Sequence, residues 1–194
     1  YLKKIIMKTK YLLLASLFIA LSTFGQEFTV TPEGLRDSLD NDKSYVVIST
    51  PDKTAEQNYN NAIKYISKIY KNPKKVIKSD IKSEYLRFDT FVSDFLVVNN
   101  MGAKISQDAK FTITLSFKDS RVKFEITNLS IYNSAGGKVT FSGSAFSGFP
   151  IYNKKKTKLK RPDTKKDIEV YFNNTINNIK NEFLEKTSDS ADDW

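Results

Sequence analysis

The feature that most constrains this fold is a two-residue periodicity between positions 111 and 126. Every second residue from Phe111 to Phe117 is apolar, and so is every second residue from Val122 to Ile126, with Thr, Ser, Lys or Glu between them. Because successive side chains of a strand point to opposite faces of a sheet, this alternation indicates two half-buried strands. The short polar turn at 118–121 joins them and predicts an antiparallel hairpin.

A first amphipathic helix is predicted between Thr54 and Tyr70. Thr54 with Gln57 three residues later has the spacing of a capping box. Apolar residues then recur at helical spacing from Tyr59 to Tyr70, and Asn72-Pro73 ends the pattern. The opposite side is polar and basic, so this helix is expected to cover a sheet with one face.

A second helix is predicted after Pro162, with Thr164 and Asp167 as an acidic capping pair. Its apolar stripe comprises Ile168, Phe172, Ile176, Ile179 and Phe183.

Three further segments have strand signals. Residues 45–48 are β-branched and aromatic, residues 85–98 hold one or two strands, and a strand follows Gly136-Gly137. After Ile126 the alternation changes phase, which predicts a bulge or strand end near Asn128.

The order of these elements, β-α-β4-α, predicts one α+β domain over residues 26–187. We expect a curved antiparallel sheet of about five strands with both helices on one face, which leaves the other face open. A binding site is most easily placed on that open face. The alternation places these polar residues there: Lys110, Thr112, Thr114, Arg121, Lys123, Glu125 and Thr127.

The N-terminus has the three parts of a secretory signal when read from Met7. Lys8 and Lys10 precede an apolar run over residues 11–21, and small residues lead to a cleavage position before Gln26. The run is about half the length of a membrane-spanning helix, which needs about 20 apolar residues. We therefore predict a signal peptide over residues 1–25 and a periplasmic or secreted protein with no transmembrane span after cleavage. Residues 188–194 form a short acidic tail.

The chain has no cysteine and no histidine. The first absence removes disulfides, thiolate nucleophiles and a lipid anchor on an N-terminal cysteine. The second removes the commonest general base and the commonest metal ligand. We expect no cofactor, no metal site and no enzymatic activity.

The formal charge of +9 is unevenly distributed. Without residues 1–25 the charge is +5, and residues 154–166 alone contribute +7. This basic segment is interpreted either as an extended, solvated connection or as a site for a polyanion. No aromatic residue interrupts it as a base-stacking surface would require, and nucleic acid is not expected outside the cytoplasm. The candidate ligand-binding residues are Lys154, Lys155, Lys156, Lys158, Lys160 and Arg161, together with Arg121 and Lys123.

The hairpin from Phe117 to Asn128, the closing helix and the tail ending Asp192-Asp193-Trp194 resemble a family of uncharacterised secreted proteins of Bacteroidota. The chain departs from that family's hairpin pattern at Ser120, where Gly is expected, and at Lys123, where Arg is expected. The resemblance implies a TATA-box-binding-protein-like (TBP-like) fold and an exported protein. It implies no catalytic residues, and the fold name implies no DNA binding.

We expect an exported, non-enzymatic protein that binds or supports an envelope protein or glycan. Two alternatives remain open. The first is a glycan hydrolase that uses carboxylates such as Glu84, Asp89 and Asp94, although the first and last would lie about 33 Å apart on one strand. The second is polyanion binding through residues 154–166.

Overall fold

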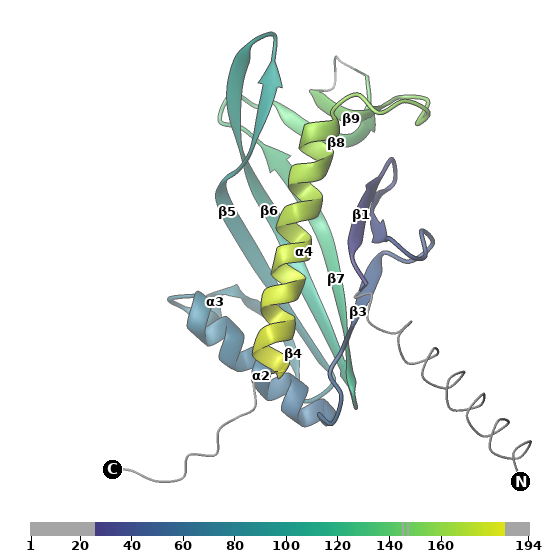
Figure 1. Ribbon diagram of the computed structural model, residues 1–194. Coiled ribbons are helices and arrows are strands. Elements are labelled where there is room, and N and C mark those ends of the chain that lie inside the picture. Colours follow the sequence, from purple (N-terminus) through teal and green to yellow (C-terminus); the bar gives the residue numbers. More distant parts are fainter. Residues whose placement is uncertain (1–25, 145, 147, 185–194) are drawn as a thin grey trace, which may run out of the picture.

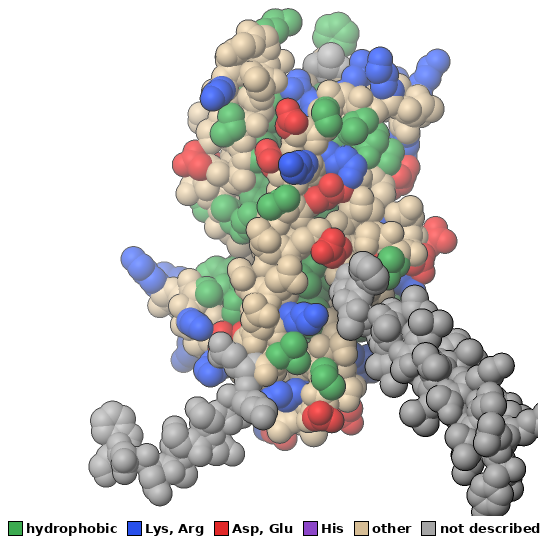
Figure 2. Space-filling model, viewed as in Figure 1, with side chains coloured by type: hydrophobic (Ala, Val, Ile, Leu, Met, Phe, Trp, Pro, Cys, Tyr) green, Lys and Arg blue, Asp and Glu red, His purple; other side chains and the backbone are tan. Residues whose placement is uncertain are grey.

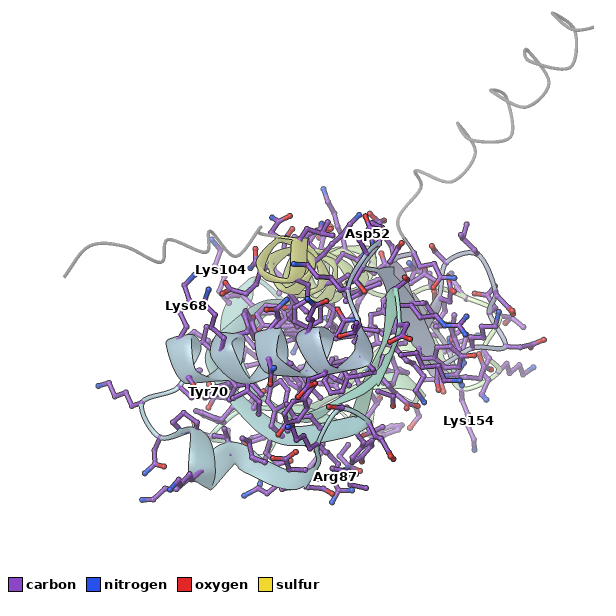
Figure 3. All side chains as sticks on the ribbon, turned by 90° about the horizontal axis from the view of Figure 1, so that it is seen from below. Asp52, Lys68, Tyr70, Arg87, Lys104 and Lys154 are labelled. Carbon is purple, nitrogen blue, oxygen red and sulfur yellow. The ribbon has the colours of Figure 1, made fainter. Side chains whose placement is uncertain are left out.

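The computed structural model describes residues 26–184 except residues 145 and 147, so the predicted signal peptide and the acidic tail lie outside the described residues. Helices α2 (Ala55–Ile69) and α4 (Pro162–Leu184) cover one face of a curved seven-stranded sheet (Figures 1 and 3). A short helix, α3 (Pro73–Val76), leads into the sheet. The predicted α+β class is confirmed.

The sheet has more strands than the expected five. Its order is β4-β5-β6-β7-β8-β9, and β3 lies beside the first half of β7. All neighbours are antiparallel except β8 and β9, and a separate hairpin is formed by β1 (Phe28–Thr31) and β2 (Gly34–Asp37). The seven strands are β3 (Tyr45–Ser49), β4 (Ile77–Ile81), β5 (Tyr85–Asn100), β6 (Ala103–Lys118), β7 (Arg121–Tyr132), β8 (Lys138–Gly143) and β9 (Phe149–Asn153).

The predicted antiparallel hairpin is present at the centre of the sheet. Phe117 lies opposite Val122, and the apolar residues of both strands are buried beneath the helices. The predicted bulge is also present: between the pairs Lys110–Ser130 and Thr112–Thr127, β7 carries one residue more than β6. Asn128 accommodates this bulge with a φ of 54°, in the left-handed region that Asn tolerates better than most residues.

Residues 85–98 form one strand, β5, with a bulge of its own. Val92 lies opposite Ala109 and Leu96 opposite Gln107, so three residues of β5 face one residue of β6. The bulge changes which face each side chain points to. It turns Phe95 toward α4, where its ring lies 4.7 Å from that of Tyr171, centroid to centroid.

The first helix begins as predicted, and the last does not. Thr54 Oγ1 accepts the Gln57 N–H and Gln57 Oε1 accepts the Thr54 N–H, which completes the capping box of α2. In α4, Pro162 is the first helical residue, because its fixed φ suits that position. Thr164 therefore lies buried within the first turn, and the expected capping pair is wrong. The apolar stripe of α4 is confirmed: all five of its residues are buried.

Two side chains of α4 bind the edge of β1. Asn173 accepts the Phe28 N–H at 2.7 Å and donates to the Phe28 carbonyl at 3.0 Å. Glu169 accepts the Val30 N–H at 2.8 Å and pairs with Lys165 on its own helix. Side chains thus replace the neighbouring strand that this edge lacks.

The Glu169 contact predicts a pH-dependent contribution to stability. Burial raises the pKa of Glu169, but hydrogen bonds from Lys165, Val30 and Thr29 outweigh it, so the pKa lies below its ordinary value. Glu169→Gln should lower the free energy of unfolding by about 1 kcal/mol at neutral pH. Because the folded-state pKa is depressed, this difference should shrink as the pH falls below the ordinary glutamate pKa of 4.5.

Urea unfolding at several pH values would measure this difference. Glu56→Gln serves as the control, because Glu56 forms only an exposed ion pair with Lys82, at 3.0 Å. The control should change stability by less than about 0.5 kcal/mol at every pH. A Glu169→Gln effect that does not vary with pH would contradict the assigned role of its charge.

Candidate functional site

A cavity of about 430 Å³ opens on the uncovered face of the sheet, near the β6–β7 turn. Strand register explains its composition: Lys123 lies between Ser116 and Val47, and Lys118 lies opposite Arg121. These side chains alternate with residues buried under the helices, so they point to the free face. The lining residues are Tyr45, Val47, Ser116, Lys118, Arg121 and Lys123, and we call this the sheet-face cavity.

The sheet-face cavity is electropositive. Lys123 Nζ lies 5.1 Å from the centre of the Tyr45 ring and 3.5 Å from Glu125 Oε2. Lys123 is therefore partly neutralised, and it is one of the three cations that line the cavity. Within the described part of the chain, the side chains of Lys118 and Arg121 have neither a hydrogen bond nor an ion pair. Two uncompensated cations in a cavity that is also lined by the Tyr45 ring suit an anionic group with an attached apolar or sugar surface.

The free face is less solvated at its centre than the alternation predicts. Thr112 and Thr114 point to this face as expected but are buried. Thr112 donates to Asp89 Oδ1 at 2.8 Å, and Thr114 lies between the longer side chains of Arg87 and Glu125. Figure 3 shows Arg87 on the side of the sheet away from α4. The short threonines are covered by their cross-strand neighbours, which is why the opening lies at the end of the sheet.

The basic segment is not the extended connection that was one expectation. Residues 154–160 form a loop in which Asn153 Oδ1 accepts the N–H groups of Thr157 and Lys158, and Tyr152 bridges to Leu159. Residues 162–166 belong to α4. Hydrogen bonds therefore hold the loop folded despite the repulsion between its lysines.

Three residues of this segment line a second cavity, of about 790 Å³. They are Lys154, Lys160 and Arg161, and the opposite wall includes Met101 at the tip of the β5–β6 hairpin. The remaining candidates, Lys155, Lys156 and Lys158, are exposed on the same loop. Of these, Lys156 pairs with Glu33 at 3.2 Å, and this hydrogen bond lowers the pKa of Glu33.

The eight candidate residues thus form two groups, not one site. Arg121 and Lys123 lie near the β6–β7 turn, and the loop residues lie at the opposite end of the sheet, beyond β9 (Figure 1). Tyr45, Val47 and Lys118 line the same cavity as Arg121 and Lys123 but are not among the residues predicted from the sequence. The alternation of residues 45–48 indicated a strand, but no local signal placed that strand beside β7.

Two of the three carboxylates of the hydrolase alternative are tied into the sheet, whereas Glu84 is exposed and its side chain has no hydrogen bond or ion pair among the described residues. Asp89 accepts the Thr112 hydroxyl, and Asp94 accepts the Ser106 hydroxyl. Asp108 accepts the backbone N–H of Asp94 at 3.0 Å. Among the residues that the structure describes, no three acidic side chains cluster as metal ligands would, and no helix has the length and apolarity to cross a bilayer.

Comparisons with known proteins bear on the fold. No known protein family matches this chain, and no curated protein matches it. Among solved structures, it is similar to a DUF4468 family protein from Bacteroides ovatus, with 15% identity over 73% of this chain and 85% of that one, at a TM-score of 0.49. It is also similar to a TBP-like protein from Parabacteroides distasonis, with 10% identity over 73% of this chain and 91% of that one, at a TM-score of 0.51.

The fold is TBP-like. This is the fold that the resemblance of the hairpin and the closing helix implied. At 10% identity, the TBP-like neighbour shares an architecture and does not pass on a function. Function must therefore be argued from the cavities of this chain.

Proposed function

We propose that this TBP-like chain is an exported, non-enzymatic binding module of the bacterial envelope that holds an anionic partner in the sheet-face cavity. The observation that carries the proposal is the pair of uncompensated cations, Lys118 and Arg121, at the mouth of a cavity on the face that no helix covers. An unpaired guanidinium can bind a carboxylate or phosphate through two parallel hydrogen bonds. An acidic envelope glycan fits both the charge and the neighbouring Tyr45 ring.

Export rests on the signal pattern between Met7 and Gly25. Expression in a Gram-negative host should therefore place the protein outside the cytoplasm, with Gln26 as the N-terminal residue found by sequencing. The non-enzymatic role rests on the chain's lack of His and Cys, and on the hydrogen bonds that Asp89 and Asp94 accept from neighbouring hydroxyls.

The binding proposal predicts a charge-specific loss of affinity. Isothermal titration with an oligomer of uronic acids should show binding, and a neutral hexose oligomer of equal length should not bind. Lys118→Gln/Arg121→Gln should weaken binding about 10- to 100-fold, because each charge-assisted hydrogen bond contributes about 1.5–3 kcal/mol and part of this is lost to solvent screening.

Lys71→Gln/Lys74→Gln is the matched control, because it removes the same charge from exposed positions at the end of α2 and in α3. It should leave the affinity unchanged within twofold. Equal weakening by both double variants would indicate nonspecific attraction to a basic protein, and would overturn the sheet-face cavity as the site. Failure of every acidic oligomer to bind would overturn the proposal itself.

A further inference from the structure

Three connections meet at the end of the molecule farthest from the sheet-face cavity. They are the β5–β6 tip at residues 100–103, the described residues of the β8–β9 connection (Ser144, Phe146 and Gly148) and the loop at residues 154–161. Residues from all three line the 790 Å³ cavity. Figure 2 shows hydrophobic side chains beside Lys and Arg side chains at this end. We call it the loop end.

The loop end presents two large apolar side chains entirely to water. Met101 is 102% exposed and Phe146 is 103% exposed, the two highest values among the exposed large hydrophobic residues of the described chain. Both line the same cavity, so they lie in one region. Such side chains add nothing to the stability of the fold, and an apolar patch with a polar rim marks an interaction surface.

Lysines surround these apolar tips. Lys154, Lys155, Lys158 and Lys160 are exposed, and their side chains have no ion-pair partner within the described residues. Glu33 neutralises only Lys156. The loop end therefore combines apolar tips with a local excess of positive charge.

Arg161 holds the loop end together. Its guanidinium donates to the Asn99 carbonyl at 3.0 Å and to Asn100 Oδ1 at 3.4 Å, and it lies 5.1 Å from the centre of the Phe149 ring. One side chain thus joins the lysine loop to the β5–β6 tip and to β9. The lysines and Met101 are presented in a fixed arrangement.

We propose that the loop end docks on the surface of an anionic lipid bilayer. Met101 and Phe146 enter the boundary between headgroups and acyl chains, and the loop lysines contact lipid phosphates. A soluble polyanion would use the lysines alone, whereas a bilayer offers anionic headgroups and hydrocarbon together. In this orientation the sheet-face cavity, at the opposite end, faces away from the membrane and stays open. The inference does not depend on the proposed function.

Vesicle co-sedimentation tests the proposal. The protein without residues 1–25 is used, because the apolar run at 11–21 would itself bind lipid and all described elements lie beyond it. It should sediment with vesicles of equimolar phosphatidylcholine and phosphatidylglycerol, and not with phosphatidylcholine alone. Lys155→Gln/Lys158→Gln should weaken binding about 25-fold, since each lysine near an anionic surface contributes about fivefold. Met101→Ser/Phe146→Ser should weaken it at least tenfold.

Two controls match these variants. Lys71→Gln/Lys74→Gln removes the same charge elsewhere, and Leu39→Ser/Ile81→Ser removes exposed apolar side chains elsewhere. Both should bind vesicles as the unmodified protein does, and circular dichroism should show every variant folded. Equal binding to both vesicle types would overturn the proposal. So would a Met101→Ser/Phe146→Ser variant with full affinity, because the loop end would then be a site for soluble polyanions only.

Discussion

Replacing Phe172 with alanine should lower the free energy of unfolding by about 3–5 kcal/mol. Phe172 lies on the buried stripe of α4, and its ring centre is 5.1 Å from that of Phe111 and 5.9 Å from that of Phe95. The substitution removes a central contact between α4 and strands β5 and β6, and it leaves a cavity that the surrounding rings cannot fill. Such a loss is a large fraction of the stability of a domain of this size.

Urea unfolding followed by far-ultraviolet circular dichroism measures this loss. Phe91→Ala is the control: Phe91 is 59% exposed on the free face, so its loss should cost less than about 0.5 kcal/mol. A Phe172→Ala effect below about 1 kcal/mol would mean that α4 does not pack on the sheet as described.

Gly148→Ala should lower the free energy of unfolding by more than the cost of placing alanine in a left-handed backbone conformation. A Cβ at Gly148 would lie 2.3 Å from the Lys138 carbonyl oxygen, and the φ of Gly148 is 110°. Backbone must move to relieve such a contact, because no flexible side chain is involved. We expect a loss of about 2–5 kcal/mol, from a left-handed conformation that costs about 1–2 kcal/mol and an overpacking cost of about 1–3 kcal/mol.

Gly102→Ala separates these two costs. Gly102 also has a positive φ, of 83°, but a Cβ there would meet nothing within 4 Å. Its substitution should cost about 1–2 kcal/mol, and Gly148→Ala should exceed it by at least about 1 kcal/mol. Equal effects would show that only the backbone conformation matters at Gly148. That result would show that the parallel pairing of β8 and β9 does not require the close approach of Gly148 to the Lys138 carbonyl oxygen.

The two sites make different demands on the fold. The sheet-face cavity depends on β3 lying beside β7, and the loop end depends on Arg161, which joins the lysine loop to the β5–β6 tip and to β9. A variant that loses glycan binding and keeps vesicle binding therefore reports on the first site alone. The opposite result reports on the second, so the two proposals can fail separately.

Local sequence signals predicted much of the fold and two of the six residues that line the sheet-face cavity. Alternation over residues 111–126 predicted the hairpin and the orientation of Arg121 and Lys123. The capping box at Thr54 predicted where α2 begins. The predicted capping pair of α4 was wrong because Pro162 and Thr164 are both residue types that often begin a helix. Only the packing of the first turn decides between them. The short strand β9 and the parallel β8–β9 pair gave no local signal, since a five-residue return rarely joins parallel strands.

The sequence by itself determined which face of each element is apolar, because side-chain periodicity follows from backbone geometry. It also determined that no His or Cys side chain contributes to either site. Only the tertiary structure decided which faces meet. It placed Tyr45 and Val47 beside Lys123, and it assigned the eight candidate cations to opposite ends of one sheet. The reason is physical: strand pairing and loop closure are long-range events whose free energy depends on packing of the whole domain.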